Sequence, residues 1–552
     1  MNISVAQLNY TIGDFEGNLQ KIRESICKAR KEGADLVVFS ELAICGYPPL
    51  DLLERHGFTE QCNRAMDKLA SETDPDIGIL IGGPEINPRG EGKMLYNSAF
   101  FLSGGKIVRV FRKTLLPTYD IFDEYRYFEP NRDFTLLHFR GKKIAVTICE
   151  DLWDEQPFEN EFYRSRLYTI SPMDELAKEG PDLVINLSAS PFSHSRQAVK
   201  QNIFIEKARK HNIPVIICNQ AGAQTELIFE GGSSVINAGG TVVKRLQFFR
   251  EDFVTFSLDG LSGKDPGEVS GALPDRVHLI RDALVCGISD YFKKLGFDSA
   301  TLGLSGGIDS AVVTVLAAEA LGPEKVHVLL LPSQYSSEHS ITDSITLAKN
   351  LGIKYDIIPI KELFLDYVRL LKPLFGDSKE DVTEENIQSR IRATLLMALS
   401  NKFGNILLNT SNKSEAAVGY GTLYGDMAGG LSVLGDVYKT DVYRLARFIN
   451  HKKKIIPLNI LTKEPSAELK PGQKDSDSLP PYDLLDPVLE LFIEKQMDLY
   501  RITALGFDRD LVSRVIRMVN RNEYKRYQTP PILRISSKAF GVGRRIPIVA
   551  KY

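Results

Sequence analysis

The sequence is poor in cysteine and tryptophan, with six cysteines and one tryptophan among 552 residues. The cysteines show no paired spacing of the kind that binds zinc, which argues against a structural zinc site and against a disulfide scaffold. No apolar run is long enough to span a bilayer. The first residues, MNISVAQLNY, contain neither a basic region nor an apolar signal core. The sequence therefore predicts a cytoplasmic protein with no membrane partner.

An excess of charge of one sign is also missing. The net charge is -3 at pH 7, so the chain lacks the polybasic field that nucleic-acid binders use, and we expect no nucleic-acid partner. The composition, 43% hydrophobic and 25% charged, is typical of a globular enzyme. At roughly 150 residues per domain, the length allows two large domains or three to four small ones.

The first half alternates short apolar segments with amphipathic ones. Strands are predicted at residues 3–7, 36–40, 79–82, 99–102, 144–148, 183–187 and 215–218. A helix is predicted at residues 18–31, and Gly104-Gly105 between two apolar segments predicts a hairpin turn. This mixture indicates a layered α/β domain.

A Gly-, Pro-, Ser- and Asp-rich stretch at residues 258–274 is the best linker candidate. We therefore place one domain at residues 1–260, a linker at 261–274 and a second domain at 275–552. In the second domain, helices are predicted at 281–295, 310–321 and 338–351, and strands at 300–304, 326–331 and 355–359. This alternation predicts a doubly wound parallel sheet with its ligand at the strand C-termini. Residues 462–481 are irregular and suit either a loop over a site or a plain surface loop.

Three polar residues of the first domain lie beside the ends of apolar segments. Glu41 lies in LVVFSELAICGYPP, Lys113 in FRKTLLPTYDIFDE and Cys149 in KIAVTICEDLW. A carboxylate can take the proton of a thiol, and an ammonium can lower its pKa and stabilise an oxyanion. The backbone N–H of Glu150 is a candidate second oxyanion donor. A single strand-end cysteine is more often a core residue, so spacing alone leaves both interpretations open.

The order SELAICGYP, RKTLLPTYDIFDE, ICEDLW resembles the carbon–nitrogen hydrolase (nitrilase) superfamily over residues 1 to about 260. The resemblance implies a four-layer αββα sandwich. In it, Glu41 would be the general base, Lys113 the oxyanion and positioning residue, and Cys149 the nucleophile. The resemblance also suggests Glu124 as the carboxylate that orients Lys113.

The segment NLSASPFSHSR is similar to the glutaminase members of that superfamily. By this likeness Tyr119, Ser190 and Arg196 bind the donor glutamine. A cation for the α-carboxylate and hydroxyls for the polar ends suit a free amino acid. The alternative is that Arg196 only covers a surface helix.

The string TLGLSGGIDSAVV follows a predicted strand and begins a helix in the second domain. Ser305, Gly306 and Gly307 can present successive N–H groups to an anion, next to the positive end of the helix. No Walker motif and no GxGxxG after a strand occurs in the chain. A loop that binds phosphate through these N–H groups, without a Walker lysine, is suited to hold pyrophosphate as a leaving group. The carboxylate of Asp309 in the same loop is suited to bind Mg²⁺, which prefers hard oxygen ligands. A generic glycine turn is the alternative.

SGGIDS resembles the ATP-pyrophosphatase signature, whose members form adenylated carbonyls and let ammonia displace AMP. Further segments, including ENIQSRIRATLLMALSN, LLNTSNKSEAAVGYGTLYGD and YKRYQTPPILRISSKAFGVGRRIPI, resemble the NAD synthetase family from about residue 275 onward. This family has an adenine nucleotide alpha hydrolase-like fold. The residues that the resemblance assigns to ATP are Gly303, Leu304, Ser305, Gly306, Gly307, Ile308, Asp309, Ser310 and Thr410.

The same resemblance assigns Mg²⁺ to Asp309 and Glu415. It assigns deamido-NAD to Asn386, Glu415, Tyr420 and Lys525, and it makes Lys439 a candidate to neutralise phosphate. Each has an alternative. Asn386 could cap a helix, Glu415 could be a first-turn acid, and Lys525 could belong to a basic tail.

Together the resemblances imply an ATP- and Mg²⁺-dependent ligase that takes nitrogen from glutamine and amidates deamido-NAD. They also imply a homo-oligomer built on dimers of the second domain. Three alternatives stay open: another ATP-pyrophosphatase amidotransferase, a nitrilase-type amidase with a regulatory nucleotide-binding domain, and a scaffold without activity. Ammonia is mostly protonated at neutral pH, so a sheltered route between the sites would help.

Overall fold

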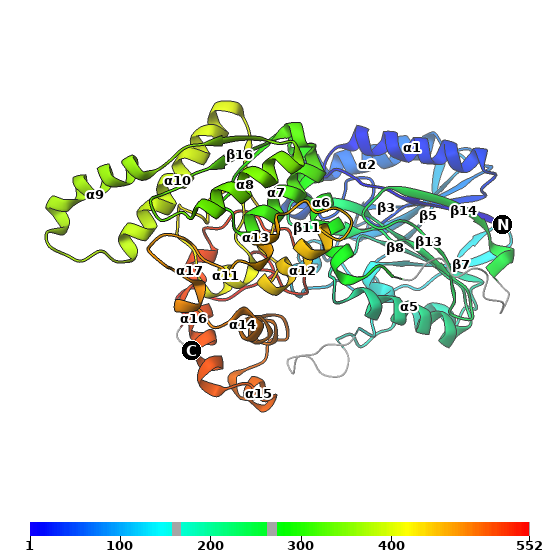
Figure 1. Cartoon of the computed structure of the whole chain (residues 1–552). Helices are drawn as coiled ribbons and strands as arrows, with labels where there is room; N and C mark the ends of the chain where they lie inside the picture. Colours follow the sequence, from blue (N-terminus) through cyan, green and yellow to red (C-terminus); the bar gives the residue numbers. More distant parts are fainter. Residues whose placement is uncertain (157–166, 262–272, 551–552) are drawn as a thin grey trace. The chain divides into compact units, whose positions relative to one another are not determined.

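The computed structural model describes residues 1–156, 167–261 and 273–550 (Figure 1). Contacts within the chain divide it into two units, Met1–Pro274 and Asp275–Tyr552, and each is described by itself. Most of the predicted linker lies outside the described residues. Within the described ranges, no helix combines the length and apolar composition that a membrane span requires.

Two six-stranded sheets form the centre of the first unit. The strands of the first sheet, in spatial order, are β14 (Asp252–Ser257), β1 (Asn2–Gln7), β2 (Leu36–Val38), β3 (Gly78–Ile86), β4 (Leu95–Ser103) and β5 (Lys106–Arg112). Those of the second sheet are β13 (Val242–Arg245), β12 (Ser234–Ile236), β9 (Val215–Asn219), β8 (Leu183–Ser188), β7 (Lys142–Ile148) and β6 (Leu137–Phe139). A hairpin of β10 (Ala221–Gln224) and β11 (Leu227–Glu230) stands apart.

Helices cover the outer faces of both sheets. α1 (Phe15–Lys31) and α2 (His56–Ser71) share a core with the first sheet, and α4 (Pro172–Ala177) and α5 (Gln197–His211) share one with the second. A third core, formed by strands of both sheets, lies between them. The order helix, sheet, sheet, helix is the αββα sandwich that the resemblance implies, and this prediction is confirmed.

Local chemistry explains where these elements begin and turn. The side chain of Asp14 accepts a hydrogen bond from the N–H of Gly17, so α1 begins earlier than predicted. Gly104 and Gly105 both have positive φ and connect β4 to β5, as the predicted hairpin requires. β2 ends at Val38, before the predicted end, which leaves Glu41 in the following turn.

The second unit contains a five-stranded parallel sheet. Its strands, in spatial order, are β17 (Lys354–Ile357), β16 (Val326–Leu330), β15 (Ala300–Gly303), β18 (Ile406–Asn409) and β19 (Leu431–Ser432). α6 (Arg276–Leu295), α7 (Ile308–Leu321), α8 (Glu338–Leu351), α10 (Val382–Phe403) and α12 (Lys439–Ile449) surround it (Figure 1). The strand order reverses at β15, and such a reversal forms a crevice at the C-terminal ends of the strands. The doubly wound prediction is confirmed.

Three further features complete the second unit. α11 (Lys413–Val418), α14 (Tyr482–Leu489), a π-helix at Glu490–Glu494, α15 (Leu499–Ala504) and α16 (Arg509–Arg521) pack around a separate small core. Pro531 and Leu533 exchange backbone hydrogen bonds with Ser432 of β19, so the C-terminal segment continues the sheet.

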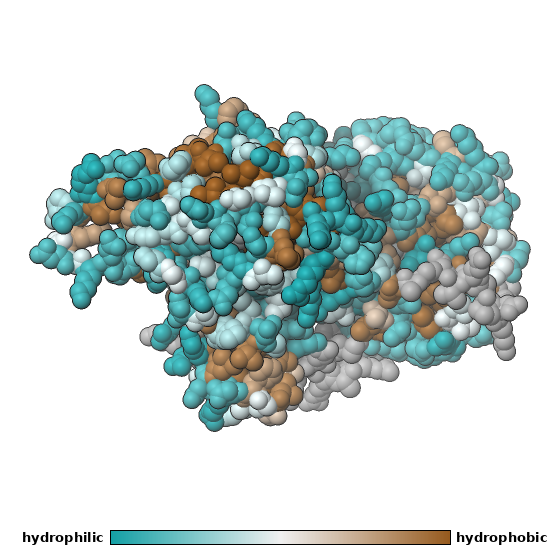
Figure 2. Space-filling view, viewed as in Figure 1, coloured by the Kyte–Doolittle hydropathy of each residue, from teal (hydrophilic) through white to brown (hydrophobic). Residues whose placement is uncertain are grey.

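α9 (Lys361–Phe375) and the start of α10 project away from the sheet, and apolar side chains lie along this projection (Figure 2).

Candidate active sites

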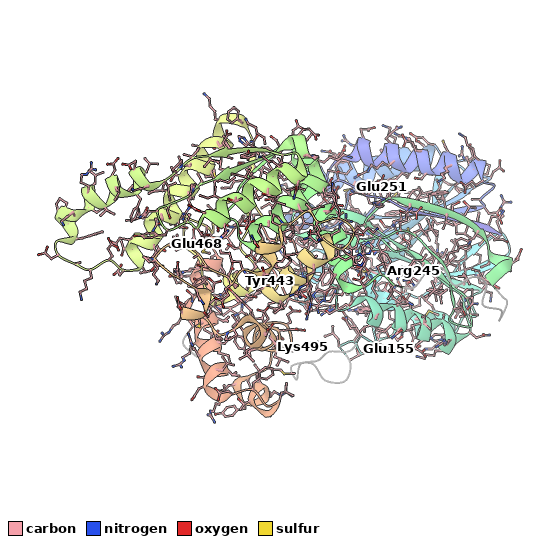
Figure 3. The ribbon with its side chains drawn as sticks, viewed as in Figure 1. Glu155, Arg245, Glu251, Tyr443, Glu468 and Lys495 are labelled. Carbon is pink, nitrogen blue, oxygen red and sulfur yellow. The ribbon has the colours of Figure 1, made fainter. Side chains whose placement is uncertain are left out.

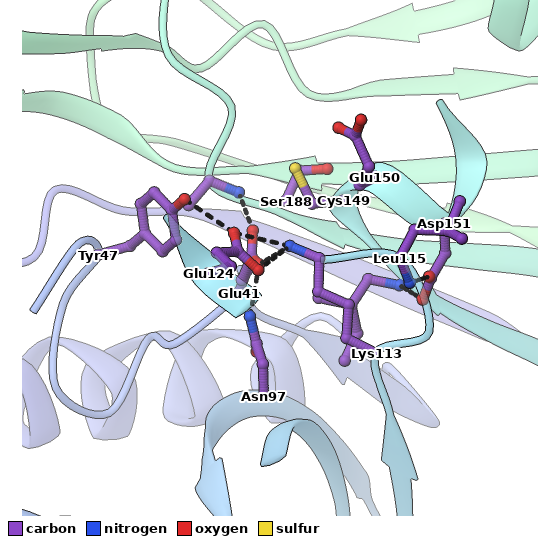
Figure 4. Close-up of polar contacts among 12 residues, drawn as sticks. Glu41, Tyr47, Asn97, Lys113, Leu115, Glu124, Cys149, Glu150, Asp151 and Ser188 are labelled. Atoms are coloured by element: carbon purple, nitrogen blue, oxygen red, sulfur yellow. Dashed lines mark hydrogen bonds and ion pairs between the residues drawn. The ribbon is translucent and has the colours of Figure 1, made fainter. Parts of the chain in front are cut away.

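The loops at three strand ends of the first unit bring Glu41, Lys113 and Cys149 together (Figure 4). Glu41 lies in the turn after β2, Lys113 directly follows β5, and Cys149 directly follows β7. Figure 4 draws Cys149 with these two residues, and the charges of Glu41 and Lys113 both act on its thiol. The three residues named from the sequence thus converge on one place.

The Lys113 ammonium lies between two carboxylates. Its Nζ is 2.7 Å from Glu41 Oε1 and 2.7 Å from Glu124 Oε2, and the lysine side chain is 0% exposed. Burial alone would lower the pKa of Lys113, but Glu124 and Glu41 together raise it well above its ordinary value. The lysine is therefore a fixed cation at the centre of the site.

The Glu41 carboxylate is held by three donors. Besides Lys113, Oε1 accepts from Asn97 Nδ2 at 2.8 Å, and Oε2 accepts from the backbone N–H of Ala189 at 3.0 Å. Tyr47 donates to Glu124 Oε1 at 2.9 Å, which fixes the other carboxylate in turn. Nothing in the local sequence pointed to Tyr47, Asn97 or Ala189.

Cys149 occupies a strained turn with φ of +44°. Burial and the neighbouring Glu41 raise the pKa of the thiol well above its ordinary value, and Lys113 opposes them. The thiol is therefore protonated in the free protein and needs a base before it can act as a nucleophile. Glu41 is the carboxylate whose charge acts most strongly on it.

Glu150, the residue after the nucleophile, forms a second polar cluster. Its Oε1 accepts hydrogen bonds from Tyr119 at 2.9 Å, Tyr168 at 2.9 Å and Gln156 at 2.6 Å. Burial raises the pKa of Glu150 to about 7, against the opposing effect of Lys113.

Of the residues expected to hold glutamine, Tyr119 belongs to this cluster. The positive charge of Arg196 acts on Tyr119, and the Arg196 side chain has no hydrogen-bond or ion-pair partner among the described residues. The backbone N–H of Ser190 donates to Asn219, and Ser190 follows Ala189, which contacts Glu41. The Tyr119 hydroxyl thus bonds to the residue that follows the nucleophile, and the charge of Arg196 acts on that tyrosine, whereas Ser190 contacts Asn219 through its backbone.

In the second unit, a cavity of about 290 Å³ opens at the C-terminal ends of the strands. The predicted ATP residues all line it, namely Gly303, Leu304, Ser305, Gly306, Gly307, Ile308, Asp309, Ser310 and Thr410. Gly306 has φ of +81°, and a Cβ there would lie 2.6 Å from the carbonyl oxygen of Ser340. Only glycine therefore fits this position of the loop.

A lysine bridges two carboxylates at the floor of this cavity. Lys439 Nζ is 2.5 Å from Asp309 Oδ2 and 3.1 Å from Glu415 Oε1. Asn412 caps α11 and donates to Asp309 Oδ1 at 2.9 Å. Burial raises the pKa of Glu415 to about 8, against the opposing effect of Lys439.

The two carboxylates fit a magnesium site. Mg²⁺ prefers hard oxygen ligands and commonly binds through one or two carboxylates together with phosphates and water. Asp309 and Glu415 provide such a pair, and the ammonium of Lys439 already lies where positive charge is favoured. The described residues contain no cluster of three or more acidic, histidine or cysteine ligands, so phosphate oxygens would complete the set.

The four residues expected to contact deamido-NAD lie around the 419–422 loop, but only two of them line the cavity. Glu415 and Tyr420 line the cavity, and Tyr420 donates to Asp475 at 3.1 Å. Asn386 and Lys525 are not part of the cavity lining. Asn386 accepts from Thr422 at 2.7 Å, and Lys525 donates to the carbonyls of Gly419 and Gly421, on either side of Tyr420.

The irregular stretch at 462–481 contributes to the cavity wall. Lys463, Glu468 and Asp475 line the cavity, and Lys463 bonds to Ser340 at 2.6 Å. Figure 3 marks Glu468 on this stretch and Tyr443 on α12, and both line the cavity. The interpretation as a loop over a site therefore fits the geometry, although no lining residue could be named from this composition in advance.

Comparisons with known proteins agree across the whole chain. Residues 2–160 match the family model described as carbon-nitrogen hydrolase, and residues 280–529 match that of NAD synthase. The chain is 46% identical to a glutamine-dependent NAD(+) synthetase of Synechocystis sp., with 100% of this chain and 99% of the relative covered. For the protein of that name from Thermotoga maritima the identity is 42%, with the same coverage.

Solved structures agree with the relatives. One is a glutamine-dependent NAD⁺ synthetase from Acinetobacter baumannii in complex with adenosine diphosphate. It is 37% identical with a TM-score of 0.77, and 99% of this chain and 98% of that chain are covered. A structure from Cytophaga hutchinsonii has a TM-score of 0.82 at 21% identity, with 100% of this chain and 98% of that chain covered, and bears on the fold alone.

Proposed function

The chain belongs to the glutamine-dependent NAD⁺ synthetase family, and on that premise we propose how its residues divide the reaction. The first unit releases ammonia from glutamine, and the second uses ATP to amidate deamido-NAD to NAD⁺. The observation that carries the proposal is the buried Lys113 ammonium, bonded to Glu41 and Glu124 beside Cys149. A lysine with only a structural role would not require a neighbouring cysteine whose backbone is strained.

In the first unit, Glu41 takes the proton of the Cys149 thiol. The thiolate attacks the carbon of the glutamine side-chain amide, and Lys113 with the backbone N–H of Glu150 stabilises the resulting oxyanion. The carbon–nitrogen bond breaks, and Glu41 returns the proton to the departing ammonia. Glu41 then activates the water that hydrolyses the thioester and releases glutamate.

The Glu150 cluster is suited to the rest of the donor. A free amino acid carries an α-carboxylate and an α-ammonium, which require a cation and an anion. Arg196 provides the cation for the carboxylate, and Glu150 provides the anion for the ammonium. Tyr119 and Ser190 supply hydroxyl groups, and Tyr119 already donates to Glu150.

In the second unit, the nicotinate carboxylate of deamido-NAD attacks the α-phosphorus of ATP, and the bond to pyrophosphate breaks. The N–H groups of the loop 303–310 and the ammonium of Lys439 offset the charge on the leaving group. Asp309 and Glu415 would hold Mg²⁺, which supplies further positive charge to the phosphates when bound. Ammonia then attacks the acyl carbon of the adenylate, and AMP leaves.

Deamido-NAD is assigned to residues around one loop. Tyr420 lies at the cavity, and Lys525 fixes the backbone on both sides of it. Asn386 is bonded to Thr422, close behind Tyr420 in the chain. We therefore place the dinucleotide against the 419–422 loop, with Glu415 facing the reacting end.

The second unit also carries a surface suited to self-association. On α9, Phe364, Val368 and Leu371 pack inward against the core. Leu363, Tyr367, Leu370 and Leu374 form a second apolar stripe at helical spacing, and Leu370 and Leu374 are 75% and 79% exposed. The outward stripe, which we call the α9 face, is assigned to a second copy of this chain, in line with the dimers that the family resemblance implies.

The decisive experiment supplies the protein with ATP, Mg²⁺, deamido-NAD and either glutamine or ammonium, and measures NAD⁺, AMP and pyrophosphate. We expect all three products with either nitrogen source. Cys149→Ala should lose synthesis from glutamine and keep synthesis from ammonium, because only the first step needs the thiol. Equal loss from both sources would contradict the proposal that the first unit only releases ammonia and the second forms the amide.

Asp309→Ala should lose synthesis from both nitrogen sources, because ATP activation precedes the entry of ammonia. The matched control is Asp356→Ala, which removes an acidic residue of β17 that is half exposed and outside the cavity lining. Retained synthesis with normal Mg²⁺ dependence in Asp309→Ala would remove Asp309 from this role.

A further inference from the structure

Lys113 and Cys149 belong to different sheets. Lys113 follows β5 at the edge of the first sheet, and Cys149 follows β7 in the second. In the described chain no strand ladder joins β5 to β7, so the ladders do not fix the distance between the two residues. Catalysis nevertheless requires it to be fixed, because an error of 1 Å in the position of reacting groups can cost about 100-fold in rate.

One side chain connects the two strand ends. Asp151 Oδ1 accepts hydrogen bonds from the backbone N–H groups of Thr114 at 3.0 Å and Leu115 at 2.8 Å, directly after Lys113. Its Oδ2 accepts from the backbone N–H of Ile148 at 3.2 Å, directly before Cys149. A single carboxylate thus binds the backbone on both sides of the nucleophile–lysine pair.

The environment of Asp151 favours this connection. The residue is 3% exposed, so water does not compete for its oxygens. Its bond to Ile148 also closes the turn in which Cys149 holds φ of +44°, a conformation that costs about 1 kcal/mol or more for a residue other than glycine. The same group therefore sets the spacing of two catalytic residues and maintains a strained turn.

We infer that Asp151 is a positioning residue of the glutaminase site, which holds the Lys113 loop and the Cys149 turn at a fixed separation. It touches neither the donor nor the reacting atoms in this assignment. The inference rests on the proposed roles of Lys113 and Cys149. It extends them by explaining how two separate sheets present one site.

Asp151→Asn is the first test. An amide has one acceptor oxygen, so its NH₂ group must face either Ile148 N–H or the Thr114 and Leu115 N–H pair. We expect kcat for glutamine hydrolysis to fall about 100-fold, because the separation between the lysine and the thiol is no longer fixed. KM should change less than threefold. Synthesis from ammonium in the same protein should stay within twofold, which excludes general unfolding.

The cavity beside Asp151 allows a second test by chemical rescue. A cavity of about 620 Å³ is lined by Asp151, Thr114, Thr147 and Asp133. In Asp151→Ala, formate should enter this space, accept the same N–H groups and restore glutamine hydrolysis at least tenfold, whereas equal chloride should not. Asp133→Asn is the matched control, because Asp133 lines the same cavity and its carboxylate forms a surface ion pair with Arg89.

The outcomes separate this inference from the proposed function. A kcat of Asp151→Asn within threefold of the unmodified protein overturns the inference, as does an equal loss of synthesis from ammonium. Failure of formate to restore a folded Asp151→Ala, judged by near-ultraviolet circular dichroism, overturns the role of its acceptor oxygens. Retained glutamine hydrolysis in Cys149→Ala, measured in parallel, would instead overturn the proposed site.

Discussion

Glu150 shows how one buried residue can make substrate binding depend on pH. Burial raises its pKa to about 7, so the carboxyl group is neutral below that pH and charged above it. Only the charged form attracts the α-ammonium of glutamine. We expect KM for glutamine to rise by up to about tenfold as the pH falls from 8 to 6, because with a pKa of about 7 the charged fraction of Glu150 falls from about nine-tenths to about one-tenth.

The measurement is KM for glutamine across this pH range, in the unmodified protein and in Glu150→Gln. The variant keeps hydrogen-bonding capacity but has no charge, so its KM should be high and independent of pH. Synthesis from ammonium is the control, because it does not require the donor pocket. An unchanged KM in Glu150→Gln would contradict the assignment of Glu150 to the donor.

At the residue scale, the sequence predicts reactive groups better than the groups that orient them. Glu41, Lys113 and Cys149 lie in distinctive strings next to strand ends, and the structure brings them together. Asn97, which orients Glu41 from 56 residues away, has no local feature that distinguishes it from other asparagines. Orienting contacts depend on tertiary packing, and the local sequence does not record them.

At the scale of elements, Lys413 connects three segments far apart in the chain. It is fully buried at the start of α11, and its Nζ lies 2.8 Å from both Asp436 and Glu494. It also donates to Ser536 and to the carbonyl of Lys538 in the C-terminal segment. The π-helix at Glu490–Glu494 places Glu494 within reach of this lysine.

Lys413→Met should destabilise the second unit by about 3–5 kcal/mol, because it leaves two buried carboxylates without their cation. Chemical denaturation followed by far-ultraviolet circular dichroism measures this, and the transition of the first unit, followed by the fluorescence of the single tryptophan, Trp153, should not move. Lys470→Met is the control. Lys470 is half exposed and pairs with Glu385 at the surface, so the loss should stay below about 1 kcal/mol. Equal effects of the two substitutions would show that the buried ion pairs of Lys413 do not stabilise the second unit.

The order of the longer elements follows from sequence periodicity, but their limits depend on contacts. Helix α6 begins at Arg276 rather than at the predicted residue 281, because Asp275 caps it. Strands β12 and β13 are too short for a periodic signal and form only by pairing with their neighbours. The π-helix has no distinct sequence pattern, since its extra residue is accommodated through packing.

At the scale of the whole molecule, the α9 face predicts self-association. Leu370→Glu together with Leu374→Glu places two charges on the exposed stripe, and charges at the core of an interface are strongly unfavourable. We expect the oligomer to dissociate to smaller species in analytical ultracentrifugation, with glutamine hydrolysis within twofold of the unmodified protein.

Lys372→Glu, on another side of the same helix, is the control for added negative charge on an exposed residue. It should leave the sedimentation coefficient unchanged. Dissociation in both variants, or in neither, would show that the stripe is not the contact between copies. The sequence alone could not distinguish this stripe from the core stripe, because both faces of α9 carry large apolar residues at helical spacing.

The order of the strands also determines when each unit can complete its fold during synthesis. β1 lies between β2 and β14, so the sheet is incomplete until residues 252–257 have been synthesised. The second unit needs Pro531 and Leu533 beside β19, much later in the chain. Because domains fold in order from the N-terminus on the ribosome, each new molecule acquires its supplier of nitrogen before its consumer.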